Sequence, residues 1–126
     1  MGFPSPAQDY VENRLSLDEM CNTNGAAVYL FKSDIESPLA GIKRGALLVC
    51  NRSLDPLDGS IVCMAIDNHF KVVRFRNVPR LHLEDINNPE RKIKISEDEM
   101  GLGEEGICFG VITHILNDAR VKLEGV

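Results

Sequence analysis

Residues 29–49 read Tyr29-Leu30-Phe31-Lys32-Ser33-Asp34-Ile35-Glu36-Ser37-Pro38-Leu39-Ala40-Gly41-Ile42-Lys43-Arg44-Gly45-Ala46-Leu47-Leu48-Val49, and this stretch decides the fold of the chain. Its apolar ends predict two β-strands, joined by a polar loop and a turn that contains Gly41 and Gly45. Serine hydrolases hold their nucleophile in a loop of this kind, which makes Ser37 a candidate. Because most serines in loops only stabilise turns, Ser37 alone does not establish catalysis.

The rest of the chain continues this β pattern. Short apolar runs predict strands at 26–31, 46–50, 60–66, 69–76, 80–84, 92–95 and 107–116. Asp67-Asn68 predicts a tight hairpin between two of these strands, because both residue types tolerate positive φ. We therefore predict a mainly β fold, with one domain at 29–126.

Residues 1–28 are expected to form an N-terminal arm with one short helix. Apolar residues recur at helical spacing over 6–14, which predicts a helix with Ser5 as its N-cap. Residues 16–24 are polar and irregular. Leu15 and Leu17 alternate with polar residues, as in an edge strand.

Length and charge limit the function classes. The 126 residues suffice for one hydrophobic core. The net charge of −5 argues against a protein that grips nucleic acid by its own field, so any link to DNA should run through a protein partner. The basic residues of the second half form either a partner patch or scattered solvated charges: Arg74, Arg76, Arg80, Arg91, Lys92 and Lys94.

The four cysteines indicate a reducing compartment. Cys21, Cys50, Cys63 and Cys108 lack the C-x-x-C spacing typical of a metal site, and three of them lie in apolar runs. This pattern predicts reduced core cysteines of a cytoplasmic protein. We also expect no membrane span and no signal peptide, because no apolar run has the required length. No metal or cofactor is expected.

Several separated segments resemble, in the same order, the LexA/UmuD family of self-cleaving serine peptidases. The loop around Ser37 is similar to the family's Ser-Gly-Asp-Ser-Met pattern. The other matching segments are Gly2-Phe3-Pro4-Ser5-Pro6-Ala7, Asp9-Tyr10-Val11-Glu12, Asp58-Gly59-Ser60-Ile61-Val62, Ala65-Ile66-Asp67 and Phe109-Gly110-Val111-Ile112 with His114. The resemblance covers nearly the whole chain and is strongest to the processed, UmuD′-like form. It implies a curved antiparallel β fold like the C-terminal domain of LexA.

The resemblance also implies a serine–lysine dyad, with Ser37 at the nucleophile position. When the family's lysine strand is aligned through Asp67 and Phe70, the catalytic lysine falls on Val73 and its basic neighbour on Arg74. Valine has no lone pair and cannot act as a general base. Ser37 is therefore expected to be a vestigial nucleophile.

Substitute bases are poorly placed. Lys71 shares a strand face with Val73 but lies about 7 Å along the strand, whereas a base must come within about 3 Å of its serine. In the serine loop, Ile35 and Pro38 replace the family's glycine and methionine, and Pro38 has no backbone N–H to donate to an oxyanion.

Three functions follow from the resemblance. In the first, the chain is a protease-dead homodimer that binds a UmuC-like translesion polymerase and acts with a RecA filament in error-prone synthesis during the SOS response. In the second, it is an active self-cleaving peptidase with Lys71 as base. In the third, it is the dimerisation half of a LexA-like repressor. The native sequence upstream of Gly2 would separate the three.

Overall fold

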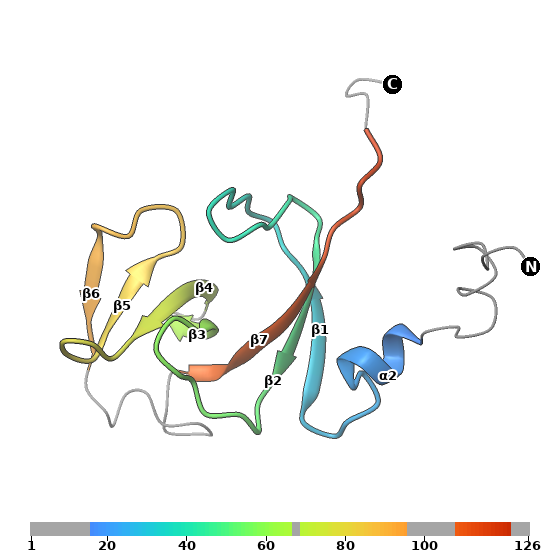
Figure 1. The fold of residues 1–126 in the computed structure, drawn as a ribbon, viewed down its shortest axis with the longest axis horizontal. Helices are drawn as coiled ribbons and strands as arrows, with labels where there is room; N and C mark the ends of the chain where they lie inside the picture. The colour runs from blue at the N-terminus through green and yellow to red at the C-terminus, as the bar shows by residue number, and fades with distance from the viewer. Residues whose placement is uncertain (1–15, 67–68, 96–107, 122–126) are drawn as a thin grey trace, which may run out of the picture.

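The structure is a computed structural model and describes residues 16–66, 69–95 and 108–121. Within these ranges it contains one short helix and seven strands (Figure 1). The elements are α2 (Leu17–Cys21), β1 (Val28–Lys32), β2 (Leu47–Asn51), β3 (Ile61–Ile66), β4 (His69–Arg76), β5 (His82–Asp85), β6 (Lys92–Lys94) and β7 (Cys108–Leu116). The predicted mainly β fold is confirmed. The strand expected at 69–76 matches β4 at both ends. Each of the other predicted strands differs from the observed one by one or two residues at one or both ends.

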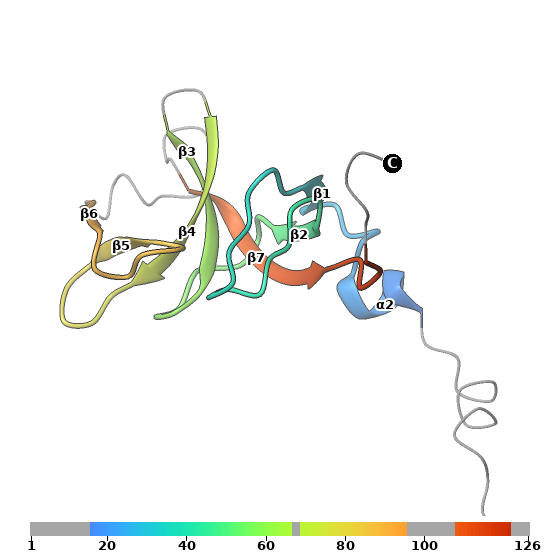
Figure 2. The ribbon, with the colours of Figure 1, turned by 90° about the horizontal axis from the view of Figure 1, so that it is seen from above.

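All seven strands belong to one antiparallel sheet in the order β1-β2-β7-β3-β4-β5-β6. β7 holds the two halves of this sheet together. Its residues 111–116 pair with β2, and its residues 108–111 pair with β3. β7 therefore runs from the β1–β2 side to the β3–β4 side, which Figures 1 and 2 show from two directions. The strands β1 and β6 form the two edges of the sheet.

The short helix corrects one sequence-based expectation. Leu17 was expected to lie in an edge strand, but it is the first residue of α2. Ser16 caps the helix by accepting a hydrogen bond from the Glu19 N–H at 3.4 Å, and Asn22 ends it in the left-handed conformation. Local capping thus outweighs the weak alternation of two leucines. The helix predicted over 6–14, its Ser5 cap and the Asp67-Asn68 turn lie outside the described residues.

The buried side chains form two clusters on opposite faces of the sheet. The first consists of Ile42, Ala46, Leu48, Cys50, Cys63, Val72, Ile86 and Ile112. The second consists of Val62, Met64, Val73, Phe75, Leu83, Cys108 and Val111. Successive residues of a strand point to opposite faces, so Val72 packs in the first cluster and Val73 in the second.

Three buried cysteines lie on neighbouring strands of the sheet. Cys50, Cys63 and Cys108 come from β2, β3 and β7, and each is unpaired, as expected for a reduced core. Burial raises the pKa of Cys63 to about 12, with a further contribution from the neighbouring thiols. Burial likewise raises the pKa of Cys50 and of Cys108 to about 11. The thiols therefore stay protonated, which makes them poor nucleophiles.

We expect the free energy of unfolding to fall as the pH rises from about 9 to 11. In the unfolded chain the thiols ionise near pH 8.5, whereas in the folded chain they keep their protons, so alkaline pH favours the unfolded state. Urea unfolding at pH 8, 9.5 and 10.5 measures this trend. The stability difference between the wild type and Cys63→Ala should narrow as the pH rises. A stability difference that stays constant over this pH range would show that Cys63 does not contribute to the pH dependence of unfolding.

Candidate functional site

The loop between β1 and β2 presents Ser37 in a tight hairpin. The Ser37 N–H donates to the Ile42 carbonyl at 2.8 Å, and the Ile42 N–H donates back to the Ser37 carbonyl at 2.9 Å. Gly41 lies in the intervening turn with φ of 74°, a conformation that favours glycine. The sequence therefore predicted the loop correctly, and backbone pairing fixes the position of Ser37.

The Ser37 hydroxyl is buried and bonded to backbone groups. It donates to the Ile86 carbonyl at 3.2 Å and accepts from the Ala40 N–H at 3.3 Å. Ser37 is 0 % exposed. Among the described residues, no lysine, arginine or histidine nitrogen forms a hydrogen bond with this hydroxyl. A carbonyl oxygen can accept the hydrogen bond but cannot take the proton as a general base.

Two asparagines hold the Ser37 loop from other parts of the chain. After β7, the Asn117 side chain donates to the Gly41 carbonyl at 2.8 Å and accepts from the Lys43 N–H at 2.9 Å. After β5, the Asn87 side chain donates to the Glu36 carbonyl at 3.0 Å. Sequence reasoning missed both asparagines and Ile86, because an isolated asparagine in a turn carries no signal of a distant partner.

The two predicted dyad positions, Ser37 and Val73, lie on opposite faces of the sheet. Val73, at the position of the family's lysine, is fully buried in the second cluster. The groups that contact Ser37 belong to Ala40, Ile42 and Ile86, which pack in or against the first cluster together with Val72. The Ser37 loop therefore packs on the face of the sheet that carries Val72.

Lys71 lies on the same face of β4 as Val73 and is exposed to solvent. Within the described part of the chain, the Lys71 amine has no hydrogen-bond or ion-pair partner. Arg74 points to the other face, where its Nη1 donates to the Gly59 carbonyl at 2.7 Å. Neither side chain is among the partners of the Ser37 hydroxyl.

Two pockets flank the Ser37 loop. A pocket of about 390 Å³ is lined by Glu36, Ser37, Pro38, Gly41, Ile42, Lys43 and Asn117. Because Ser37 has no exposed surface, a molecule in this pocket would reach its hydroxyl only after the loop moves.

The second pocket, of about 470 Å³, lies beside the edge strand β1 and contains an aromatic cluster. The Phe109 ring lies 5.2 Å from the Tyr29 ring and 5.0 Å from the Phe70 ring, measured between ring centroids, and the Arg52 guanidinium lies over Phe109. Phe70 is 65 % exposed, and Tyr29 and Leu30 are also exposed. This region presents apolar surface next to β1, which forms an edge of the sheet in the part of the chain that the structure describes.

Two other kinds of site, a metal centre and a membrane span, are absent from the described residues. These residues contain no group of three or more histidine, cysteine or acidic side chains that could hold a metal ion. None of their helices has the length and apolar character needed to cross a membrane.

The chain is similar in sequence to known proteins over most of its length. Residues 1–104 match the family described as Peptidase S24-like. The chain is 39 % identical to Protein ImpA of Salmonella typhimurium over 94 % of its own length and 79 % of that protein. It is 38 % identical to Protein MucA of Escherichia coli over 97 % of its own length and 82 % of that protein. It is 30 % identical to the LexA repressor of Photorhabdus laumondii over 88 % of its own length and 56 % of that protein. The chain therefore belongs to the Peptidase S24-like family, as a UmuD-like member of the LexA/UmuD group.

Proposed function

We propose that this chain is a UmuD′-like, homodimeric accessory subunit of an error-prone translesion DNA polymerase in the SOS response. The observation that carries the proposal is the similarity to ImpA and MucA over nearly the whole chain, at 39 % and 38 % identity. The partners would be a UmuC-like polymerase and a RecA filament in the cytoplasm. The chain would contribute binding surfaces and no chemistry.

The surroundings of Ser37 support a loss of peptidase activity. The hydroxyl is buried and bonded to the Ile86 carbonyl, and the aligned lysine position holds Val73. Lys71 would be the base of an active peptidase, but it is exposed and does not contact Ser37 in the described structure. Self-cleavage with Lys71 as base therefore remains the less favoured alternative.

Two surfaces are suited to contacts with other chains. Within the described residues, the part of β7 from Ile112 to Leu116 pairs with β2 on one side only, because the pairing with β3 ends at Val111. This open side of β7 is our candidate for the homodimer contact, because a second copy could add its own β7 there by two-fold pairing. The exposed apolar side chains of Tyr29 and Leu30 in β1 and of Phe70 in β4 are our candidate for a polymerase contact.

We expect the purified chain to be a homodimer at micromolar concentration. Sedimentation equilibrium should give twice the mass of the 14.0 kDa chain.

We also expect the tagged chain to retain a UmuC-like polymerase. This retention should be lost when Tyr29 and Phe70 are both replaced by serine. A monomer mass, or retention that does not depend on these aromatic residues, would contradict the proposed surfaces.

A further inference from the structure

A group of basic side chains shares one face of the sheet across β4, β5 and β6. Strand pairing places Arg74 opposite Glu84, and Glu84 opposite Lys92. In the next row, Arg76 lies opposite His82, and His82 lies opposite Lys94. Residues directly opposite in antiparallel strands point to the same face. We call the four cations Arg74, Arg76, Lys92 and Lys94 the basic shelf.

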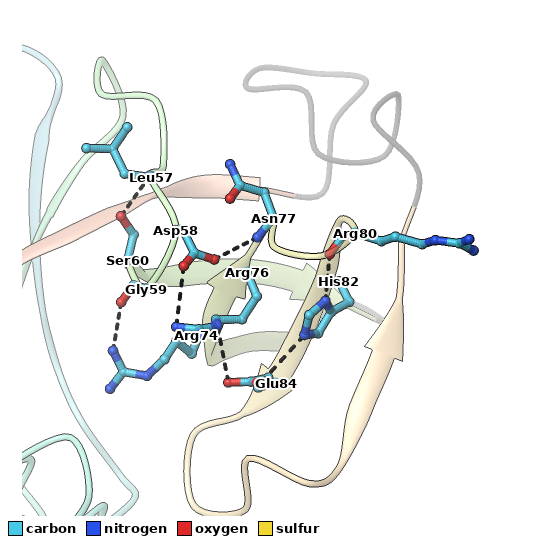
Figure 3. A network of polar contacts seen from close by, with 10 residues as sticks. All are labelled: Leu57, Asp58, Gly59, Ser60, Arg74, Arg76, Asn77, Arg80, His82 and Glu84. Carbon is cyan, nitrogen blue, oxygen red and sulfur yellow. Dashed lines mark hydrogen bonds and ion pairs between the residues drawn. The ribbon is translucent and has the colours of Figure 1, made fainter.

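The two arginines of the basic shelf are held in position by the protein (Figure 3). Arg74 uses one of its five N–H donors on the Gly59 carbonyl, at 2.7 Å. Arg76 lies between two carboxylates, 3.6 Å from that of Asp58 and 3.8 Å from that of Glu84. Side chains that are already ordered lose less conformational freedom when they bind an anion.

The basic shelf keeps a positive character despite these carboxylates. The Glu84 side chain is only 14 % exposed, and it is shared between Arg76 and His82, whose Nε2 lies 3.5 Å away. Lys92 and Lys94 are exposed, and within the described residues neither has a hydrogen-bond or ion-pair partner. A ligand that approaches this face therefore meets cations in a chain whose net charge is −5.

We propose that the basic shelf binds the phosphate backbone of nucleic acid. The lysines on β6 and the arginines on β4 are each two residues apart, or about 7 Å, and the two strands are separated only by β5. A polyanion lying across the sheet can therefore contact all four side chains. The one aromatic ring among the six face residues, the His82 imidazole, is only 12 % exposed and lies against Glu84, so it offers no surface for base stacking. The contact is therefore made to phosphate and is independent of sequence.

A protective role for the lysines does not account for the whole shelf. Lysines on an edge strand also prevent pairing with other strands, but that role does not require two ordered arginines on β4. An acidic protein strand added beside β6 would reach Lys92 and Lys94. It would lie three strand spacings, or roughly 14 Å, from Arg74 and Arg76. The placement of all four cations on one face thus favours nucleic acid over an acidic strand.

The net negative charge of the chain makes the isolated contact weak and strongly dependent on salt. The basic shelf would therefore act when another protein holds nucleic acid close by. The inference is independent of the dimer and polymerase contacts proposed above, which involve β7, β1 and Phe70 of β4 but none of the four shelf residues.

The test is a titration of the full, isotope-labelled chain at low salt, monitored by the NMR chemical shifts of its backbone amides. Three ligands are added in separate titrations: a single-stranded thymidine oligonucleotide, a DNA duplex of the same length, and polyglutamate. We expect both forms of DNA to shift the amide resonances of β4, β5 and β6. The ratio of the two affinities identifies the preferred form. Lys92→Glu with Lys94→Glu should weaken DNA binding at least tenfold. The control, Lys32→Glu with Lys43→Glu, changes the net charge equally and should weaken it less than twofold.

Several results would overturn the inference. They are the absence of shifts with either DNA, shifts located outside β4–β6, or equal weakening by both charge reversals. Tighter binding of polyglutamate than of DNA at these residues would instead identify an acidic protein as the ligand. If the charge reversal unfolds the chain, Lys92→Gln with Lys94→Gln replaces it, and it should still weaken DNA binding severalfold more than the matched glutamine control.

Discussion

The chain is expected to leave uncut, at neutral and at alkaline pH, an arm peptide that carries a Cys-Gly bond, which the resemblance implies as the type of bond that self-cleaving relatives hydrolyse. Ser37 has no exposed surface, and its hydroxyl donates to a backbone carbonyl and contacts no base among the described residues. General-base assistance typically contributes about 10²–10⁴-fold to such reactions. Mass spectrometry of the chain and the peptide after incubation between pH 7 and pH 10 measures this directly.

Restoring a lysine provides the informative comparison. The alignment places the missing base at Val73, whereas packing places Val72 on the face of the sheet that carries the Ser37 loop. Val72→Lys and Val73→Lys should therefore be tested in parallel, and cleavage by either would show that the base was the missing part. If the unmodified chain cuts the peptide and Ser37→Ala abolishes the cutting, the peptidase is active and Lys71 becomes the base to test.

Gly110→Ala is expected to destabilise the fold by about 3 kcal/mol, which corresponds to roughly 10–20 °C in melting temperature. Gly110 lies in β7 beside the C-terminal end of β2. A Cβ atom there would lie 2.7 Å from Cys50 Sγ and 2.9 Å from the Asn51 carbonyl oxygen. The thiol could rotate away, but the carbonyl belongs to the paired backbone of β2 and cannot move without loss of pairing. Thermal unfolding followed by circular dichroism measures the loss.

Two further variants distinguish the effect of crowding at position 110 from the effect of backbone strain at a glycine. Gly41→Ala meets no atom within 4 Å and strains only a residue at positive φ, so it should cost only about 1–2 kcal/mol. Cys50→Ala combined with Gly110→Ala should recover only part of the loss, because the Asn51 carbonyl remains. A Gly110→Ala protein within about 0.5 kcal/mol of the wild type would show that β2 and β7 are not packed this closely.

The sequence predicted the sheet well because its information is local. Short apolar runs mark the strands and turn-forming residues separate them, and they located β4 at both ends. The helix α2 was missed because its few residues include only two leucine or methionine side chains, and its formation depends on the caps Ser16 and Asn22. Capping signals in such a short stretch are easily mistaken for a loop.

The candidate site was predicted only in part, because its remaining contacts are made across long sequence distances. The loop that holds Ser37 is visible in the sequence, but the carbonyl of Ile86 and the side chain of Asn117 reach it from distant segments. The basic shelf is a similar case. Six basic residues were visible as a composition bias, and strand register determined which four of them share a face with Glu84.

The central proposal is that this chain supports translesion synthesis through binding and without peptidase chemistry. The most direct measurement is lesion bypass on a primed template by a UmuC-like polymerase with a RecA filament, with and without the chain. Bypass should require the chain and should be unchanged by Ser37→Ala, because this substitution removes only a hydroxyl bonded to backbone groups. Bypass that does not depend on the chain, or that a folded Ser37→Ala variant fails to support, would contradict the proposal.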